Sequence, residues 1–199
     1  MSVRIILASN SEIRSTLLRN AGVVFDVMGA RVDEDSAKAS LIADGVSPRD
    51  IADALAEMKA RKISERYPEA LVIGCDQVLD LDGLILSKPG TPEAAITQLA
   101  QMRGQVHRLI SAAVICQGGA SVWRHVGVVQ MQMRDVSDSY TDDYVARNWD
   151  SIRHSVGAYK LEEEGVRLFG RITGDYFHVL GLPLLELLGF LTTRGVLDT

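Results

Sequence analysis

The stretch that most constrains the fold is Leu71–Pro89, which reads LVIGCDQVLDLDGLILSKP. It opens with an apolar run typical of a buried strand, and we expect that strand to end near Asp76. Asp82-Gly83 lies between two apolar runs and predicts a β-hairpin turn. An acid at the end of a buried strand, with Lys88 following in the same stretch, is costly to desolvate without a partner. The stretch therefore predicts a strand, a hairpin and a charged partner beside Asp76.

Length and composition limit the class of protein. The 199 residues suit one large domain, or one with two lobes, around a substantial core. A formal net charge of −5 argues against a nucleic-acid-binding face. Cys75 and Cys116 form no C-x-x-C pair and the histidines are scattered, which argues against a zinc site or a disulfide framework. With no signal peptide and no long apolar span, we expect a cytosolic protein that binds no membrane.

The N-terminal segment carries a candidate anion site. An apolar strand, Val3–Ala8, leads directly into Ser9, which with Glu12 fits a capping box that begins a helix. Free backbone N–H groups and the helix dipole favour phosphate at such a point, and Arg14 adds a forked donor one turn further on. The alternative is an ordinary helix cap with a solvated arginine. The chain has no P-loop consensus.

Two further segments carry charged candidates with two readings each. Glu34 belongs to a run of three acids, which is either part of a magnesium site or a solvated loop. Ser47 and Pro48 begin a helix on which Lys59 falls within the apolar sector. A lysine there either reaches a ligand or only extends its ammonium group to solvent.

The remaining pattern predicts a mixed α/β sheet with flanking helices and a central groove. The expected elements are a helix from Thr91, strands over 106–116 and 122–133, a helix over 137–149, strands over 157–161 and 166–172, and a closing helix over 184–191.

Seven short motifs, in order along nearly the whole chain, resemble those of the Maf-type nucleoside triphosphate pyrophosphatases. They are ILASNSEIRSTLL, VDE at Val32–Glu34, ALAEMKA at Ala54–Ala60, IGCDQV at Ile73–Val78, SKP at Ser87–Pro89, GAYKLEEEG at Gly157–Gly165 and GDYFHVLGLP at Gly174–Pro183. The resemblance implies one Maf-like domain over residues 1–199. It also implies an elongated, two-lobed α/β fold similar to the inosine triphosphatases, with the nucleotide in the groove between the lobes.

The same resemblance implies an activity and a set of site residues. The activity is hydrolysis of the α–β phosphoanhydride of a nucleoside triphosphate, which releases a monophosphate and pyrophosphate. Asp76 is the implied proton acceptor, and Glu34 and Asp76 are the implied ligands of a divalent cation, Mg²⁺ or Mn²⁺. The side chains implied to face phosphate are Ser9, Arg14, Lys59 and Lys88. Dimers are frequent in the family, although the sequence itself identifies no interface.

Gln77 and Glu162 stand where most relatives carry Thr and Gln, and this pairing resembles the branch that hydrolyses 7-methyl-GTP. A carboxylate at Glu162 favours the positive charge of N7-methylated guanine, and Gln77 can pair with a base edge. Glu162 can equally be one more solvated acid in a turn. Ile13 occupies a third specificity position, where an aromatic ring would stack on the base; it supplies only apolar contact, so the base stays undetermined.

Three alternatives to a 7-methyl-GTP pyrophosphatase stay open. They are an enzyme for dTTP and UTP, an enzyme for inosine or xanthosine triphosphate, and a non-catalytic nucleotide-binding regulator of cell division. The presence of Asp76 together with Glu34, Lys59 and Lys88 favours an enzyme, since a regulator needs no acid facing a metal.

Overall fold

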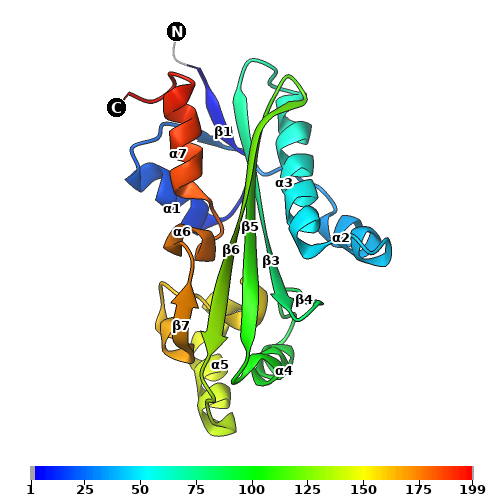
Figure 1. Cartoon of the computed structure of the whole chain (residues 1–199), viewed down its shortest axis with the longest axis vertical. Helices are drawn as coiled ribbons and strands as arrows, with labels where there is room; N and C mark the ends of the chain where they lie inside the picture. The colour runs from blue at the N-terminus through cyan, green and yellow to red at the C-terminus, as the bar shows by residue number, and fades with distance from the viewer. Residues whose placement is uncertain (1–2, 199) are drawn as a thin grey trace. The chain divides into compact units, whose positions relative to one another are not determined.

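The computed structural model describes residues 3–198 and confirms the mixed α/β fold (Figure 1). Within these residues the sheet has seven strands in the order β2-β1-β3-β5-β6-β7, and β4 pairs with β3. β1 is parallel to β2 and β3, whereas the β3–β4 and β6–β7 pairs are antiparallel. The strands are β1 (Ile5–Leu7), β2 (Asp26–Val27), β3 (Leu71–Leu81), β4 (Leu84–Leu86), β5 (Val106–Gln117), β6 (Ala120–Met133) and β7 (Phe169–Thr173).

Several helices begin where the sequence predicts. The side chains of Ser47, Thr91 and Ser137 each accept a hydrogen bond from a backbone N–H in the first turn of a helix. The helices are α1 (Glu12–Asn20), α2 (Glu34–Ala43), α3 (Pro48–Ser64), α4 (Pro92–Met102), α5 (Asp138–Ile152), α6 (Tyr176–Val179) and α7 (Leu184–Thr193), with 3-10 turns η1 (Val156–Ala158) and η2 (Glu164–Leu168). Among the described helices, none combines the length and apolar character that a bilayer crossing requires.

The chain forms two compact units. The first comprises Met1–Asp76, Ser111–Gly127 and Gly181–Thr199, and the second comprises Gln77–Ile110 and Val128–Leu180. Strands β3, β5 and β6 each contribute residues to both units. Asp76 is therefore the last residue of the first unit before the chain enters the second.

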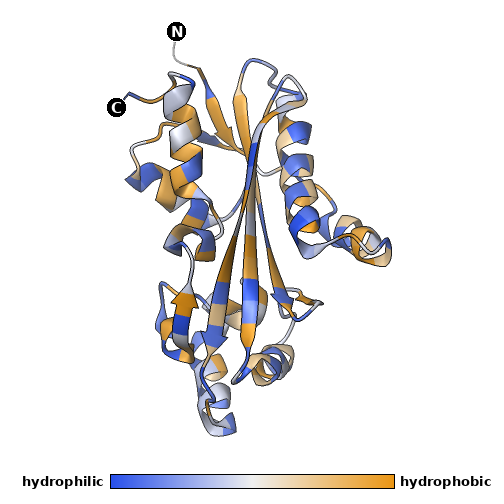
Figure 2. Ribbon diagram, in the orientation of Figure 1, coloured by the Kyte–Doolittle hydropathy of each residue, from blue (hydrophilic) through white to orange (hydrophobic). Residues whose placement is uncertain are grey.

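In the first unit, α1 and α7 lie on one side of the strands and α2 and α3 on the other (Figure 1). α3 carries alternating hydrophilic and hydrophobic bands (Figure 2) and buries Ile51, Leu55 and Ile63. It approaches β3 at Gly74, where an added Cβ would lie 2.1 Å from the carbonyl oxygen of Ala56. The absence of a side chain at Gly74 therefore sets the spacing between helix and strand.

The Leu71–Pro89 stretch differs from expectation in one respect. β3 does not end near Asp76 but continues to Leu81, so the acid lies in the middle of a buried strand. The hairpin is confirmed, because Leu81 pairs with Leu84 across Asp82-Gly83, whose φ angles are 50° and 91°. Positive φ at both positions is the geometry of a type I′ turn, which Asp-Gly adopts readily.

The second unit has its own core. α4 packs against α5, and the buried side chains include Leu99, Met131, Met133 and Tyr144. The predicted strand over 157–161 is wrong, because η1 and a turn occupy this segment and Gly157 has a φ of 76°. The strand expected over 166–172 begins only at Phe169, after η2.

Candidate active site

A buried ion-pair cluster in the first unit brings together three of the predicted site residues. The Nζ of Lys59 lies 2.7 Å from Oδ1 of Asp76 and 2.7 Å from Oε2 of Glu34. The side chains of Lys59 and Asp76 are 7% and 11% exposed, whereas that of Glu34 is 46% exposed. The cluster thus has a buried end on β3 and an open end on α2.

Local structure explains why these side chains meet. An added Cβ at Gly74 would lie 2.7 Å from the backbone N of Ala60, so α3 and β3 are in close contact there. Lys59, the residue before Ala60, therefore reaches Asp76, two residues after Gly74 on β3. Glu34 is the first residue of α2, whose N-cap is Asp33. Hydrogen bonds from the backbone N–H and hydroxyl of Ser36 lower the pKa of Asp33, which keeps the cap ionised.

A second cluster in the same unit forms around Arg14. Its Nε donates to the carbonyl of Gly181 at 2.8 Å, and its Nη1 donates to the Cys75 carbonyl at 3.1 Å and to Ser9 Oγ at 3.3 Å. Lys59 also reaches the Cys75 carbonyl, at 3.4 Å. The two clusters therefore share the peptide that precedes Asp76, and Arg14 leaves only Nη2 for a ligand among its contacts with described residues.

Ser9 does not cap the helix as the sequence predicts. α1 begins at Glu12 with Ser11 as its N-cap, and the hydroxyl of Ser9 accepts from the backbone N–H of Ser11 at 3.2 Å. Ser9 is nevertheless buried beside Arg14 in the loop between β1 and α1. Ile13, half-buried on α1, lies next to Arg14 in the chain.

Asp76 has one oxygen engaged and one open. Oδ1 pairs with Lys59, and Oδ2 makes no hydrogen bond to any residue from 3 to 198. Burial raises the pKa of the neighbouring Cys75 thiol, so that group stays neutral. A neutral thiol is a weaker nucleophile and metal ligand than a thiolate.

The donor set fits a divalent cation of the magnesium type. Mg²⁺ prefers oxygen ligands and is usually held by one or two carboxylates together with substrate phosphates and water. Glu34 and Asp76 supply two carboxylates that already converge on one cationic group, at 2.7 Å each. Mn²⁺ accepts the same ligands.

The other predicted residues belong to the second unit. Lys88 is exposed in the segment after β4. Gln77 is half-buried, and its Nε2 donates to the main-chain oxygens of His178 and Val179, both at 3.0 Å. Its amide hydrogens therefore bind the chain itself.

Glu162 is exposed in the turn before η2. Its neighbours Glu163 and Glu164 bind Ser151 and Arg147, respectively, but among the described residues Glu162 has no ion pair or hydrogen bond. Its surroundings fit a solvated acid, and they also leave its carboxylate open to a cationic ligand.

The sequence did not predict the roles of two glycines and one carbonyl oxygen in these clusters. Gly74 lies inside the IGCDQV motif and Gly181 inside GDYFHVLGLP, but a motif match does not reveal why a side chain is excluded. Gly181 has a φ of 85°, and an added Cβ would lie 3.0 Å from Nη2 of Arg14. The Cys75 carbonyl carries no sequence signal at all, since every residue has one.

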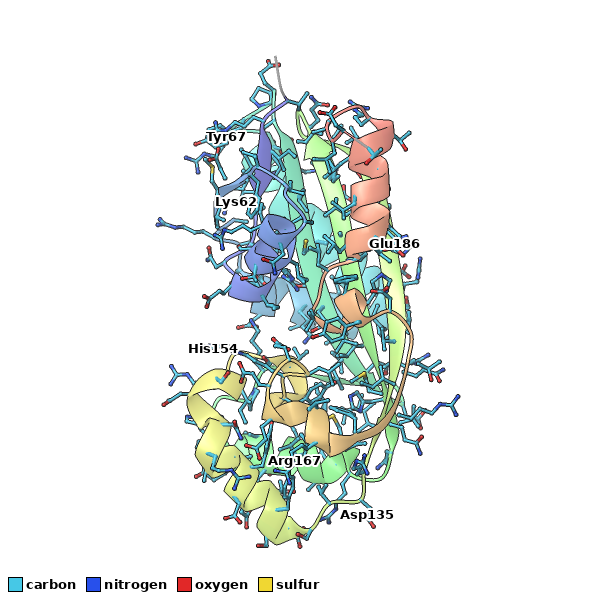
Figure 3. All side chains as sticks on the ribbon, turned by 90° about the vertical axis from the view of Figure 1, so that its left-hand side faces the viewer. Lys62, Tyr67, Asp135, His154, Arg167 and Glu186 are labelled. Atoms are coloured by element: carbon cyan, nitrogen blue, oxygen red, sulfur yellow. The ribbon has the colours of Figure 1, made fainter. Side chains whose placement is uncertain are left out.

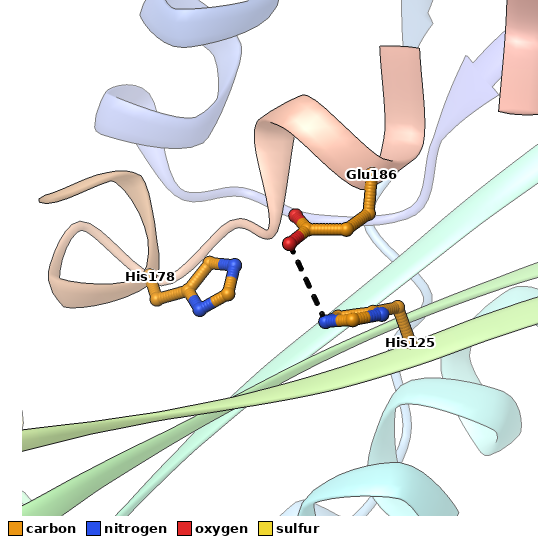
Figure 4. Close-up of side chains that lie close together, drawn as sticks. All are labelled: His125, His178 and Glu186. Carbon is orange, nitrogen blue, oxygen red and sulfur yellow. Dashed lines mark ion pairs between the residues drawn. The ribbon is translucent and has the colours of Figure 1, made fainter. Parts of the chain in front are cut away.

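The first unit also contains a partly exposed pair of a histidine and a glutamate. Nε2 of His125 lies 3.6 Å from Oε1 of Glu186 (Figure 4), and the ring of His125 stacks on Trp123 with centroids 6.4 Å apart. Both side chains are about one-third exposed, so a pair of this kind contributes little to stability.

Comparison with known proteins agrees with the motif analysis. The family model described as Maf-like protein matches residues 4–194. Over 199 residues, the chain is 65% identical to a nucleoside triphosphate pyrophosphatase of Ruegeria pomeroyi, and the match covers all of both proteins. It is 66% identical over 191 residues to a protein of the same name from Roseobacter denitrificans, with 96% of each covered. It is 45% identical over 198 residues to a 7-methyl-GTP pyrophosphatase of Brucella abortus, again over 100% of both. The chain belongs to the Maf family.

Proposed function

We propose that this protein is a nucleoside triphosphate pyrophosphatase, which cleaves between the α- and β-phosphates and releases a nucleoside monophosphate and pyrophosphate. The observation that carries the proposal is the cluster of Glu34, Lys59 and Asp76. In it the ammonium nitrogen of the lysine lies 2.7 Å from one oxygen of each carboxylate. Membership of the Maf family and high identity to relatives named for this activity support it.

In this proposal Asp76 orients and deprotonates the attacking water. Its Oδ2 is the atom for this role, because Oδ1 is already paired with Lys59 and Oδ2 has no partner among the described residues. A cation held at Oδ1, which in this structure is the ammonium group of Lys59, fixes the plane of the carboxylate, so that the remaining oxygen has a defined direction.

Cationic side chains stabilise the negative charge that develops on the phosphates. Lys59, Lys88 and the unused Nη2 of Arg14 are assigned this role, and Ser9 adds a hydroxyl beside Arg14. A bound Mg²⁺ or Mn²⁺ would neutralise phosphate charge and lower the pKa of a bound water. Glu34 and Asp76 are the residues that would hold it.

For the substrate we propose 7-methyl-GTP, with dTTP and UTP or inosine and xanthosine triphosphates as the alternative. The exposed carboxylate of Glu162 favours a cationic base. The 45% identical relative named 7-methyl-GTP pyrophosphatase supports the same choice. The side-chain amide hydrogens of Gln77 bind two main-chain oxygens. Base recognition through Gln77 therefore requires a rearrangement of these contacts.

Pyrophosphate release tests the catalytic role of Asp76. We expect Asp76→Asn to lower kcat at least a hundredfold. An amide accepts no proton from water at neutral pH, and it replaces a negatively charged metal ligand by a neutral one. Asp82→Asn is the matched control, since Asp82 is an exposed turn residue and Asn tolerates its positive φ. Activity of Asp76→Asn within a few-fold of the wild type would remove Asp76 from this role.

The same assay over a panel of nucleotides tests the substrate. We expect kcat/KM to be highest for 7-methyl-GTP and to fall for Glu162→Gln on that substrate alone. A clear preference for dTTP or UTP contradicts the assignment. Tight nucleotide binding without turnover of any nucleotide favours the non-catalytic regulator.

A further inference from the structure

The ammonium group of Lys59 has the surroundings of a bound cation. A lysine carries three N–H donors, and here three oxygens surround its Nζ, two as hydrogen-bond acceptors and one as an ion-pair partner. Oδ1 of Asp76 and Oε2 of Glu34 lie at 2.7 Å, and the Cys75 carbonyl lies at 3.4 Å. Two carboxylates and a carbonyl are also the ligand types that hard divalent cations select.

A divalent cation and this ammonium group compete for the same two acids. Both are positive, and an ammonium at hydrogen-bond distance from both carboxylates leaves no room for a second cation between them. Either the metal takes the carboxylates or Lys59 keeps them.

We propose that Lys59 is the resident cation of this site and that a divalent metal binds only by displacing its ammonium group from Glu34 and Asp76. The inference rests on the proposed function, in which both acids hold the metal. The lysine keeps two acids paired in the metal-free protein. Once displaced, its ammonium group is released for the phosphates of the nucleotide.

The geometry indicates how the metal reaches the two acids and how its binding affects that of the nucleotide. The side chain of Glu34 is 46% exposed, so metal reaches the cluster from the α2 end, while Asp76 at the buried end is 11% exposed. The triphosphate offers the displaced ammonium a new partner, so nucleotide and metal strengthen each other's binding, and this coupling is reciprocal.

Titration with Mn²⁺ alone, followed by electron paramagnetic resonance, tests the competition without any catalytic readout. We expect Lys59→Met to bind Mn²⁺ at least tenfold more tightly than the wild type, because the acids lose their competing cation. Lys62→Met is the matched control, since Lys62 lies on the same helix and donates to the Arg31 carbonyl at 2.5 Å. Its affinity for Mn²⁺ is expected to equal that of the wild type. Equal or weaker binding by folded Lys59→Met, or no binding by either protein, overturns the proposal.

A second measurement uses only the wild-type protein, so it does not require that a variant folds. Acetylation by an amine-specific reagent, read by peptide mass spectrometry, reports the accessibility of each lysine. Lys59 is 7% exposed and paired, and we expect its acetylation to accelerate several-fold on addition of Mn²⁺. Exposed Lys62 serves as the internal reference. An unchanged or slower rate at Lys59 overturns the proposal.

The two hypotheses fail separately. Rapid pyrophosphate release with no change at Lys59 on metal addition refutes the displacement and leaves the enzyme assignment intact. Displacement of Lys59 without turnover of any nucleotide refutes the enzyme assignment alone.

Discussion

His107 is a fully buried titratable side chain in the second unit. Its Nε2 lies 2.7 Å from the hydroxyl of Tyr159, and its ring contacts those of Tyr159 and Phe169. Its Nδ1 is buried without a hydrogen-bond partner among the described residues. Burial lowers the pKa of His107 to about 4, because the imidazolium form would lose its hydration without gaining an acid.

This burial predicts an acid-sensitive stability. Between the unfolded pKa of about 6.5 and the folded value of about 4, the unfolded chain binds more protons, so acidification favours unfolding. The stabilisation is complete above pH 6.5 and falls by about 3 kcal/mol by pH 4. We expect His107→Gln, whose amide can donate to or accept from the hydroxyl of Tyr159, to lose less stability than the wild type between pH 7 and pH 4.5 in urea unfolding. His154→Gln is the control, because His154 is exposed (Figure 3). Parallel pH profiles for His107→Gln and wild type would contradict the assignment.

Among the secondary-structure elements, the contact between α3 and β3 matters most for the site. An added Cβ at Gly74 would meet the backbone of Ala56 at 2.1 Å and of Ala60 at 2.7 Å. Backbone cannot move aside as the end of a flexible side chain can, so the helix must shift. Lys59 lies between these two contacts and moves with the helix.

We expect Gly74→Ala to destabilise the protein by about 1–3 kcal/mol, the usual cost of overpacking. We also expect it to lower pyrophosphate release, because the shift of α3 moves Lys59 out of its position beside the acids and the phosphates. The measurements are urea unfolding and the pyrophosphate assay. Gly90→Ala is the control, since no heavy atom lies within 4 Å of its added Cβ. Wild-type stability and activity for Gly74→Ala would show that α3 and β3 leave room for a methyl group at Gly74.

The whole molecule is expected to gain stability from metal and nucleotide together. A ligand that binds only the folded state at a hundred times its Kd adds about 2.7 kcal/mol. With Mn²⁺ and a 7-methyl-GTP analogue bearing a methylene bridge between the α- and β-phosphates, we expect the Tm to rise by several degrees. Addition of EDTA should abolish most of that rise, since the acids then return to Lys59. A Tm that responds equally with and without EDTA would show that nucleotide binding needs no metal.

Much of the fold follows from local sequence signals. The caps at Ser47, Thr91 and Ser137 depend on neighbouring backbone groups, and the Asp82-Gly83 turn depends on two φ angles. Predictions failed where long-range packing decides. The run after Ile73 continues as strand because its neighbours in the sheet pair with it, although Gly74 there looks like a stop.

Two other local errors have different causes. Glu34 and Asp35 lie in the first turn of α2 rather than in a solvated loop, and the sequence does not predict this helix because it buries no residue and so lacks the apolar period that identifies a helix. The segment over 157–161 is apolar enough for a strand, but the positive φ of Gly157 and Ala158 turns the chain. Neither conformation has a periodic pattern in the side chains.

The sequence by itself determined the family, the mixed α/β class and the residue types of the site, because motifs and periodicity are local properties of a chain. Only the tertiary structure decided which of those residues meet. It brings Glu34, Lys59 and Asp76 within hydrogen-bond distance, and it engages Arg14 with the carbonyls of Cys75 and Gly181. The reason is physical. The sequence specifies which side chains are charged, whereas folding determines which main-chain oxygens lie beside them and how far a helix lies from a strand.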